Sequence, residues 1–411
     1  MKIVYNLSIF AAKYLLKVVA LFNTKIKQGV DGRKQTFTIL AKHLQPSDLT
    51  LWFHCASLGE YEQGLPVFNE LKKIYPKHKV VLTFFSPSGY EIRKNAPVAD
   101  CVVYLPLDTP YNAKRFINAV KPELTVFVKY DIWPNYLLTL KTQNRNAILI
   151  SALFRKNQSY FKGYGKFMRD ALFGFSHIFT QDEASKSLLK SINYNAVTVS
   201  GDTRFDRVSN QLQTDNTLEF IKTFKQNNIC VVAGSTWPED EAFLIHYINQ
   251  NKNNAVKYII APHNIKSNQI QHLQNSLNVQ SVLYSEMNSA TLIQAKVLII
   301  NTIGLLTKIY NYANIAYVGG AVGTTGLHNT LEPAVFGCPI IIGSHYQKFP
   351  EAKAMIAQKG MFSISSQTEL NSILDKLINN EYFREESGHK NSNYIKNNQG
   401  SVVQILDFLR K

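Results

Sequence analysis

The sequence is short of cysteine, and its few cysteines are not paired. Four occur in 411 residues, and no two of them form a Cys-x-x-Cys pair. Three lie in or beside apolar runs, a pattern typical of buried free thiols in a reducing compartment. This scatter argues against a zinc site, and we expect neither a metal nor a cofactor. The four positions are Cys55, Cys101, Cys230 and Cys338.

Acidic residues are also scarce beside basic ones. The chain has 29 Asp and Glu against 45 Lys and Arg, which gives a formal charge of +16. Such a charge suits nucleic acid, an anionic membrane surface or an anionic substrate about equally. The basic residues form no long block and no nucleic-acid signature, so nucleic-acid binding remains only a fallback. Tandem repeats and low-complexity tracts are absent, and the length suits two domains of roughly 200 residues.

No long apolar run is free of charge. The longest candidate, residues 3–22, is interrupted by Lys13 and Lys17, which lie four apart on one helical face. Two charges near the middle make a spanning helix costly, and no small-residue cleavage site marks a signal peptide. We predict a membrane-interface helix over residues 1–25, with its lysines toward anionic headgroups. The alternative is a helix packed on the first domain.

Short apolar runs alternate with helical stretches in two successive series. This pattern predicts βαβ units, each series with a parallel sheet. We therefore predict an α/β fold of the GT-B plan, in which two Rossmann-like domains face each other across a cleft. The predicted divisions are 1–25 (amino-terminal membrane-associated helix), 26–207 (first domain), 208–228 (polar connection), 229–395 (second domain) and 396–411 (terminal helix). The predicted strands are Leu51–His54, Val80–Phe84, Cys101–Tyr104, Leu124–Val128, Ala147–Ile150, His177–Thr180, Ala196–Val199, Cys230–Ala233, Tyr258–Ala261, Ser281–Tyr284, Val297–Ile300, Ile315–Val318 and Pro339–Ile342.

The segment Ser57-Leu58-Gly59-Glu60 ends a predicted strand and opens a helix. Gly59 permits a tight turn and the close approach of a ligand. Glu60 near the helix start is placed to take a proton from an attacking hydroxyl. The alternative is a carboxylate that only stabilises the positive end of the helix dipole.

Two charged residues follow the strand Leu124–Val128. Lys129 and Asp131 come directly after it, so they point into the same cleft mouth as Glu60. The alternative for Asp131 is a helix N-cap, with Pro134 in the first turn. Both roles are compatible.

Arg204 lies in the segment Gly201–Asp206, just before the polar connection. A cation there can stabilise a departing phosphate. A surface salt bridge to Asp202 or Asp206 explains the arginine equally well.

Two small-residue turns in the second half suit an anion. Ser235 and Thr236 follow a predicted strand and precede a helix, where free backbone N–H groups favour anions. The longer loop from Gly319-Gly320 to His328 leads into a helix whose Glu332 can accept hydrogen bonds from a ribose diol. The loop lacks the Gly-Lys-Ser/Thr ending of a Walker A motif. A capping turn and a structural glycine loop are the alternatives.

Taken in order and spacing, these segments resemble the 3-deoxy-D-manno-octulosonic acid (Kdo) transferases, which add Kdo to the lipid A precursor. The resemblance extends over nearly the whole chain, and its landmarks are specific together although not singly. They are His54-x-x-Ser57-x-Gly59-Glu60, Tyr104-Leu105-Pro106-x-Asp108, Trp133-Pro134-Asn135, Val197-Thr198-Val199-x-Gly201, Ala233-Gly234-Ser235-Thr236, Val318-Gly319-Gly320 and His328-Asn329-x-Leu331-Glu332-Pro333.

The resemblance implies a metal-independent, inverting transfer of Kdo from CMP-Kdo to a hydroxyl of a lipid A precursor such as lipid IVA. It implies lipopolysaccharide biosynthesis at the cytoplasmic face of a bacterial inner membrane. Glu60 falls on the family's general base, and Arg204 on a lysine thought to stabilise the transition state. The implied nucleotide contacts are Pro262, His263, Ile303, Gly304, Leu305, Asn329, Thr330, Leu331 and Glu332.

The chain departs from the family pattern at several of these positions. Lys129 stands where the family usually has a glutamate, and Asp131 replaces the second glutamate of that motif. His263 replaces an arginine beside the nucleotide, Leu305 replaces a glutamate, and Thr325 replaces an arginine of the glycine loop. We therefore expect phosphate binding to rest more on backbone amides than on side-chain cations.

Two rival functions remain open from the sequence. One is another GT-B enzyme that uses a UDP-sugar, either a transferase or an epimerase. The other is a noncatalytic binder of anionic lipid or nucleic acid, which the charge of +16 would serve. Protection of the protein against thermal unfolding by CMP rather than UDP would exclude the UDP-sugar enzyme. Turnover of CMP-Kdo would exclude the noncatalytic binder.

Overall fold

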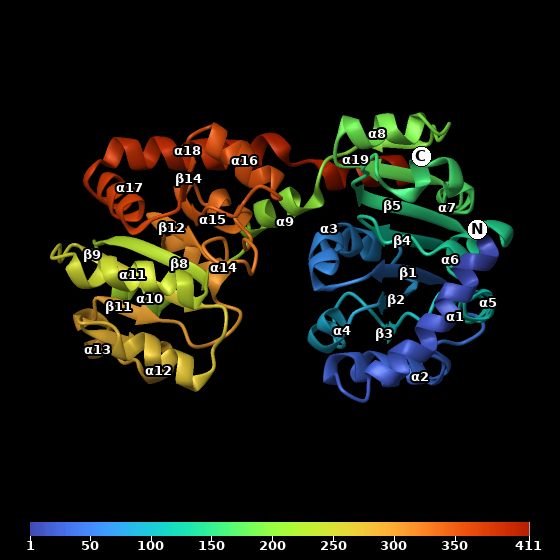
Figure 1. Ribbon diagram of the computed structural model, residues 1–411, viewed down its shortest axis with the longest axis horizontal. Coiled ribbons are helices and arrows are strands. Elements are labelled where there is room, and N and C mark those ends of the chain that lie inside the picture. Colours follow the sequence, from blue (N-terminus) through green and yellow to red (C-terminus); the bar gives the residue numbers. More distant parts are fainter. Residues whose placement is uncertain (411) are drawn as a thin grey trace. The chain divides into compact units, whose positions relative to one another are not determined.

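A computed structural model describes residues 1–410 as two compact units. The first unit comprises Met1–Arg207 and the segment from Gln399 onward, and the second comprises Val208–Asn398. Each unit has one seven-stranded parallel sheet with helices packed against it (Figure 1). Two Rossmann-like α/β domains were predicted from the sequence, and this fold class is confirmed.

The first sheet has the strand order β3-β2-β1-β4-β5-β6-β7. Its strands are β1 (Thr50–Cys55), β2 (Lys79–Phe84), β3 (Cys101–Tyr104), β4 (Leu124–Val128), β5 (Asn146–Ala152), β6 (His177–Thr180) and β7 (Val197–Val199). They are almost wholly buried because helices cover both faces. One face packs against α2, α5, α6, α7 and α8, and the other against α3, α4 and α19. The helices are α1 (Lys2–Val19), α2 (Thr24–His43), α3 (Leu58–Ile74), α4 (Pro87–Arg93), α5 (Pro110–Val120), α6 (Pro134–Thr142), α7 (Lys166–Leu172), α8 (Glu183–Lys190), α9 (Thr203–Gln211) and α19 (Ser401–Leu409).

The second sheet repeats this plan with the order β10-β11-β9-β8-β12-β13-β14. Its strands are β8 (Ile229–Thr236), β9 (Val256–Pro262), β10 (Ser281–Leu283), β11 (Val297–Ile299), β12 (Ile315–Val318), β13 (Ile340–Gly343) and β14 (Met361–Ile364). Helices α11, α12 and α17 contribute to the core on one face. The helices of this unit are α10 (Glu219–Lys225), α11 (Pro238–Gln250), α12 (Ser267–Asn275), α13 (Ser289–Gln294), α14 (Leu306–Ile309), α15 (Leu331–Val335), α16 (Pro350–Ala357), α17 (Gln367–Asn379) and α18 (Glu381–Asn398).

Every strand predicted from the sequence is present, with ends that differ by no more than three residues. The prediction misses β14, whose four residues form the edge of the second sheet. Phe362 and Ser363 in this strand are only half-buried, so it lacks the continuous apolar run of a central strand.

The borders between units differ in part from the predicted divisions. The units separate between Arg207 and Val208, within α9 and at the predicted end of the first domain. Where a polar connection was predicted over 208–228, the structure has the end of α9 and α10, which belong to the second unit. The apolar residues Ile221 and Phe224 bury α10 in that unit although the segment is polar overall. At the other end, α18 extends to Asn398 and only α19 packs on the first unit.

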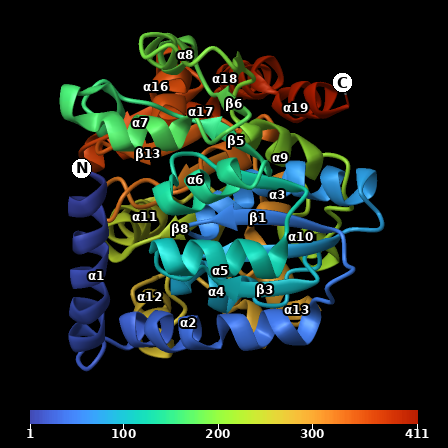
Figure 2. The ribbon, with the colours of Figure 1, turned by 90° about the vertical axis from the view of Figure 1, so that its right-hand side faces the viewer.

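Helix α1 meets α2 at a short corner, as Figure 2 shows. It is held to the first unit by the Tyr5 hydroxyl, which donates to Asp108 at 2.7 Å, so the packing predicted as an alternative is present. It nevertheless has no buried residue. Much of its apolar surface is exposed, at Ile3, Val4, Leu7, Phe10, Leu15 and Val18. Within residues 1–410, none of the helices has both the length and the apolar character needed to cross a bilayer.

Candidate active site

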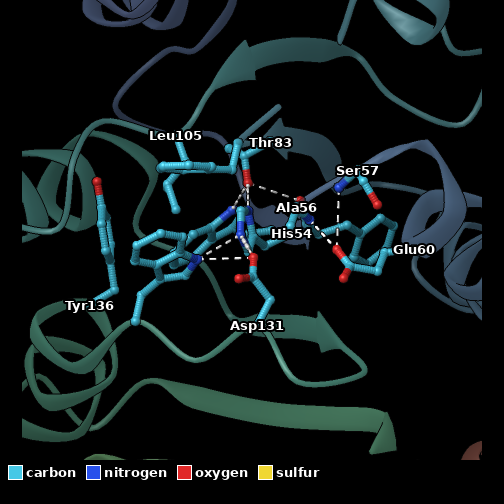
Figure 3. A network of polar contacts seen from close by, with 12 residues as sticks. His54, Ala56, Ser57, Glu60, Thr83, Leu105, Asp131 and Tyr136 are labelled. Atoms are coloured by element: carbon cyan, nitrogen blue, oxygen red, sulfur yellow. Dashed lines mark hydrogen bonds and ion pairs between the residues drawn. The ribbon is translucent and has the colours of Figure 1, made fainter. Parts of the chain in front are cut away.

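Strands β1 and β4 are neighbours in the first sheet, and the chain leaves them toward opposite sides. Open α/β sheets bind ligands outside the carboxyl ends of strands at such a point, where the strand order reverses. The turn into α3 follows β1 and carries Glu60. The loop after β4 carries Lys129 and Asp131. All four predicted catalytic residues belong to the first unit, and Lys129 and Asp131 both lie close enough to Glu60 to affect its charge. Figure 3 shows Glu60 and Asp131 on either side of His54.

Glu60 is the third residue of α3 and part of a capping box with Ser57. Its Oε2 accepts hydrogen bonds from the backbone N–H groups of Ala56, at 2.5 Å, and Ser57, at 3.2 Å. The helix-start role that was considered as the alternative for this residue is therefore present. Within residues 1–410, Oε1 accepts no hydrogen bond, and this oxygen is left for a ligand.

The surroundings of Glu60 favour its protonated form more than water does. Burial, followed by the nearby charge of Asp131, raises the pKa of Glu60 to about 7. The Ala56 N–H, His54 and Lys129 act in the opposite direction. A carboxylate whose pKa lies near neutral pH can take a proton and release it again, as a general base must.

Asp131 does not N-cap α6, so that alternative is wrong. Helix α6 begins at Pro134 after Trp133, and its N–H groups at Asn135 and Tyr136 donate to Asp108 instead. Asp131 points the other way, into the network of Figure 3, where its Oδ2 accepts from His54 Nε2 and from Trp133 Nε1.

Lys129 is half-buried at the end of β4 and has a left-handed backbone, with φ 67°. This conformation costs a non-glycine residue about 1 kcal/mol or more. Its ammonium group lies 5.0 Å from the ring centroid of Tyr130, and its charge lowers the pKa of Glu60. Where the family pattern has a carboxylate, this chain thus places a cation near Glu60.

Arg204, the fourth predicted catalytic residue, lies at the start of α9. Its Nε and one terminal nitrogen each contact Asp202 Oδ2 at 2.8 Å, so the predicted alternative of a salt bridge to Asp202 is present. Asp202 is buried and also accepts from Gln63 of α3 at 2.7 Å. The Arg204 side chain is still 35% exposed.

The second unit has an equivalent reversal point between β8 and β12. Ser235 and Thr236 end β8, and Gly319 and Gly320 follow β12. A side chain at Gly319 would come within 2.4 Å of the Ser235 carbonyl oxygen, so glycine permits this close approach. Gly320 has φ 96°, a left-handed conformation that favours glycine.

Several amides in and beside the glycine loop are already hydrogen-bonded within the protein. Gly319 and His328 donate to backbone carbonyls, and Gly320 donates to Asp240 Oδ2. The first N–H of the five-residue helix α15, at Leu331, donates to Asn329 Oδ1. These four amides are therefore unavailable to a ligand in this structure.

Three rings gather beside the loop. Trp237 Nε1 donates to His328 Nε2 at 3.0 Å, and the two rings are nearly coplanar. The exposed ring of His263 stacks on Trp237 and lies tilted against His328, with a centroid distance of 4.6 Å to each. Burial, with a smaller contribution from His263, lowers the pKa of His328 to about 4, and burial also lowers that of His263. Both imidazoles are neutral at physiological pH, and His263 presents an open face.

The other predicted nucleotide contacts lie on several elements of the second unit. Glu332 accepts from Asn329 Nδ2 at 3.0 Å and from the Thr307 hydroxyl at 3.2 Å, which joins α15 to α14. Thr330 and Leu331 are buried, while Ile303 is 84% exposed. The remaining predicted nucleotide contacts are Pro262 at the end of β9, and Gly304 and Leu305 before α14.

Sequence reasoning missed several residues of these sites. His54 and Trp133 appear among the sequence landmarks but were given no role, although both bind Asp131. Asp240 was given no role either. Its position three residues after Trp237, which repeats the spacing of Glu60 after Ser57, was the available signal.

Comparisons with known proteins agree with the resemblance read from the sequence. Residues 31–207 match the family model described as 3-deoxy-D-manno-octulosonic-acid transferase (kdotransferase). The chain is 27% identical over 376 residues to the 3-deoxy-D-manno-octulosonic acid transferase of Haemophilus influenzae, which covers 89% of this chain and 87% of that protein. It is 27% identical to the enzyme of that name from Aquifex aeolicus, over 80% of this chain and 86% of that protein.

Among solved structures, the chain is similar to UDP-GlcNAc 2-epimerase from Neisseria meningitidis bound to UDP-GlcNAc. The TM-score is 0.62 at 16% sequence identity, over 89% of this chain and 100% of that one. At this identity the likeness shows the fold alone. Within residues 1–410, no group of three or more His, Cys, Asp or Glu side chains is arranged to hold a metal ion.

Proposed function

We propose that this chain, which belongs to the Kdo transferase family of glycosyltransferases, transfers Kdo from CMP-Kdo to a hydroxyl of the lipid A precursor lipid IVA. The transfer proceeds with inversion at the anomeric carbon. It is a step of lipopolysaccharide biosynthesis at the cytoplasmic face of a bacterial inner membrane.

The state of Glu60 carries the proposal. One of its oxygens is fixed by two backbone N–H groups, the other accepts none, and its pKa is raised to about 7. Glu60 Oε1 takes the proton of the acceptor hydroxyl while the acceptor oxygen bonds to the anomeric carbon. The bond from that carbon to the CMP phosphate breaks, and its electron pair leaves with the phosphate oxygen. Because CMP is a fair leaving group, positioning and charge stabilisation supply the rest of the catalysis.

The remaining predicted residues divide between the two substrates. Lys129, beside Glu60, supplies a cation for anionic groups, and Arg204 stabilises the departing phosphate. In the second unit, Ser235, Thr236 and His263 contact the nucleotide phosphate, and Glu332 accepts from the ribose diol. The partly exposed side chain of Arg204 and the exposed ring of His263 support these roles.

One incubation tests the function directly. Purified protein is mixed with CMP-Kdo and lipid IVA, and the mass of the lipid product is measured by mass spectrometry. We expect added Kdo in the lipid and an equal amount of released CMP. Turnover of a UDP-sugar, together with protection against thermal unfolding by UDP but not by CMP, would instead identify a UDP-sugar enzyme. Vesicle or nucleic-acid binding without turnover would identify a noncatalytic protein.

The exposed apolar row of α1 supports attachment to the membrane surface. Helices of this kind lie in the interface and add lysine contacts with anionic headgroups, which Lys13 and Lys17 provide here. An amphiphilic acceptor would then be met at the bilayer surface.

Point variants test this attachment without removing Tyr5, which holds α1 to the first unit. Leu7→Ser with Leu15→Ser should lower sedimentation with vesicles that contain anionic lipid at least several-fold. The matched control is Tyr111→Ser with Tyr382→Ser, at residues that are at least as exposed but lie elsewhere. Equal sedimentation of both double variants would show that α1 is only structural.

A further inference from the structure

His54 is a buried histidine whose role the proposed mechanism leaves open. It is the fifth residue of β1, and its side chain is fully buried beneath the loop that follows β4. Buried polar groups are normally hydrogen-bonded, and the partners of this ring show what it holds in place.

One side of the ring is fixed by the sheet. His54 Nδ1 lies 2.8 Å from the Thr83 hydroxyl of β2, which also accepts from the indole N–H of Trp52 at 2.8 Å. Trp52, Thr83 and His54 all belong to central strands, so the imidazole has a rigid support. Its orientation is set before any ligand arrives.

The other side of the ring contacts Asp131. His54 Nε2 lies against Asp131 Oδ2 (Figure 3), and because a carboxylate only accepts, Nε2 carries the hydrogen. Trp133 Nε1 lies 3.0 Å from the same oxygen and also 3.0 Å from His54 Nε2, so the indole N–H is shared between the two partners of this contact. Asp131 itself sits in the loop between β4 and α6, where backbone structure alone fixes a side chain poorly.

We propose that His54 is a positioning residue that fixes the Asp131 carboxylate beside Glu60 through the hydrogen bond from Nε2. This inference rests on the proposed function, in which Glu60 is the base. Because Asp131 opposes ionisation of Glu60, its distance from Glu60 sets how readily the base takes and keeps a proton. A fixed carboxylate makes that effect constant from one turnover to the next.

The other titratable groups near this network do not replace His54. Lys129 acts on Glu60 with the opposite sign to Asp131. Burial first, and Asp131 among the later causes, raises the pKa of the Tyr5 and Tyr160 hydroxyls, so both stay neutral. Burial likewise raises the pKa of the Cys55 thiol, which stays protonated.

Two substitutions separate positioning from packing. In His54→Gln the side-chain amide reaches the place of imidazole Nε2, so a donor to Asp131 is retained. In His54→Asn the amide reaches only the place of Nδ1, and that donor is lost. We expect the Asn variant to lose about 10–100-fold in kcat with little change in KM for CMP-Kdo, and the Gln variant to stay within about fivefold of wild type.

His177 provides the matched control. It is a buried histidine on β6, and its Nε2 lies 3.0 Å from the Thr198 hydroxyl. Its Gln and Asn variants should have equal kcat values. Equal kcat for the two His54 variants, or a normal rate in His54→Asn, would overturn the positioning role.

A titration of Glu60 by carbon-13 NMR tests the inference without turnover. Asp131→Asn should lower the titration midpoint of Glu60 in wild type and in His54→Gln, and by less than half as much in His54→Asn. An equal shift in all three backgrounds would overturn the inference. A wild type that shows the expected titrations but transfers no Kdo would overturn only the proposed function.

A variant of the second donor keeps the inference testable if His54→Asn does not fold. Trp133→Phe removes the indole N–H from both Asp131 Oδ2 and His54 Nε2, and leaves the contacts of His54 with Thr83 and Asp131. We expect the Asp131→Asn shift to persist in full in this background, with kcat within about threefold of wild type. Loss of the shift would assign the positioning of Asp131 to Trp133 and refute the role of His54.

Discussion

Glu60 and Asp240 occupy the same place in the two units. Each is the third residue of the first helix after the strand at which the sheet order reverses, and each belongs to a capping box. Their sequence settings therefore look alike. Their environments in the folded units are different.

Asp240 uses both of its carboxylate oxygens within its own unit. Oδ1 accepts from the Tyr317 hydroxyl at 2.8 Å, and Oδ2 accepts from the N–H groups of Trp237 and Gly320, each at 2.9 Å. Asp240 is 0% exposed, whereas Glu60 is 7% exposed and keeps Oε1 without a donor. The comparison teaches that a capping carboxylate is structural when saturated and chemically available when one oxygen is left over.

The largest expected effect separates the two carboxylates by activity. Glu60→Gln preserves size and the bonds from Ala56 and Ser57 but removes the base, and kcat for Kdo transfer should fall about 10²–10⁴-fold. Initial rates of CMP release at saturating substrates measure it, with circular dichroism as the folding control. A variant that still transfers Kdo at near the normal rate would remove Glu60 from the role of base.

The next largest expected effect is a loss of stability when Asp240 is replaced. Asp240→Ala leaves the Tyr317 hydroxyl and two buried N–H groups without their acceptor, and should destabilise the second unit by about 2–4 kcal/mol. Denaturant unfolding measures the loss. Glu239→Ala, at the exposed neighbouring position, is the control and should stay within about 0.5 kcal/mol of wild type. Equal losses of stability in Asp240→Ala and Glu239→Ala would mean that the hydrogen bonds accepted by Asp240 do not stabilise the second unit.

Glu60→Gln should have the opposite effect on stability. The pKa of Glu60 is raised from 4.5 to about 7 in the folded state, so the folded protein holds this proton more tightly than the unfolded chain. The stability that follows is present below about pH 4.5 and is lost as pH rises through about 7. At pH 8 the neutral glutamine should therefore stabilise the first unit by about 1–3 kcal/mol, an exchange of activity for stability.

Thermal unfolding of wild type and Glu60→Gln at pH 5 and pH 8 measures this gain. The difference in Tm should be small at pH 5 and clear at pH 8. A gain of equal size at both pH values would come from packing and not from the charge of Glu60.

The sequence predicts local features well because they depend on neighbours in the chain. The apolar runs predict the strands, and the spacing of Ser57, Gly59 and Glu60 places a carboxylate at a helix start. The same local pattern surrounds Asp240. What differs is the donor set, and Tyr317 and Gly320 lie about eighty residues further along the chain.

Contacts across the sheet explain the other failures of prediction. Asp131 is of a residue type that is common at helix N-caps. Its actual partner, His54, lies 77 residues away on a strand that becomes a neighbour of β4 only in the folded sheet. Asp108 takes over the capping of α6 from a distance in the same way. Strand order decides these pairs, and no local spacing encodes it.

The smallest expected effect is a shift in the pH dependence of activity when a charge near Glu60 is removed. Asp131 raises the pKa of Glu60, and Lys129 lowers it. Asp131→Asn should therefore shift the acid limb of the kcat/KM profile to lower pH, and Lys129→Met should shift it to higher pH, each by about half a unit to one unit. Because the two substitutions remove opposite charges near the same oxygen, a shift of both limbs in one direction would show that another group titrates, and the limb would no longer report Glu60.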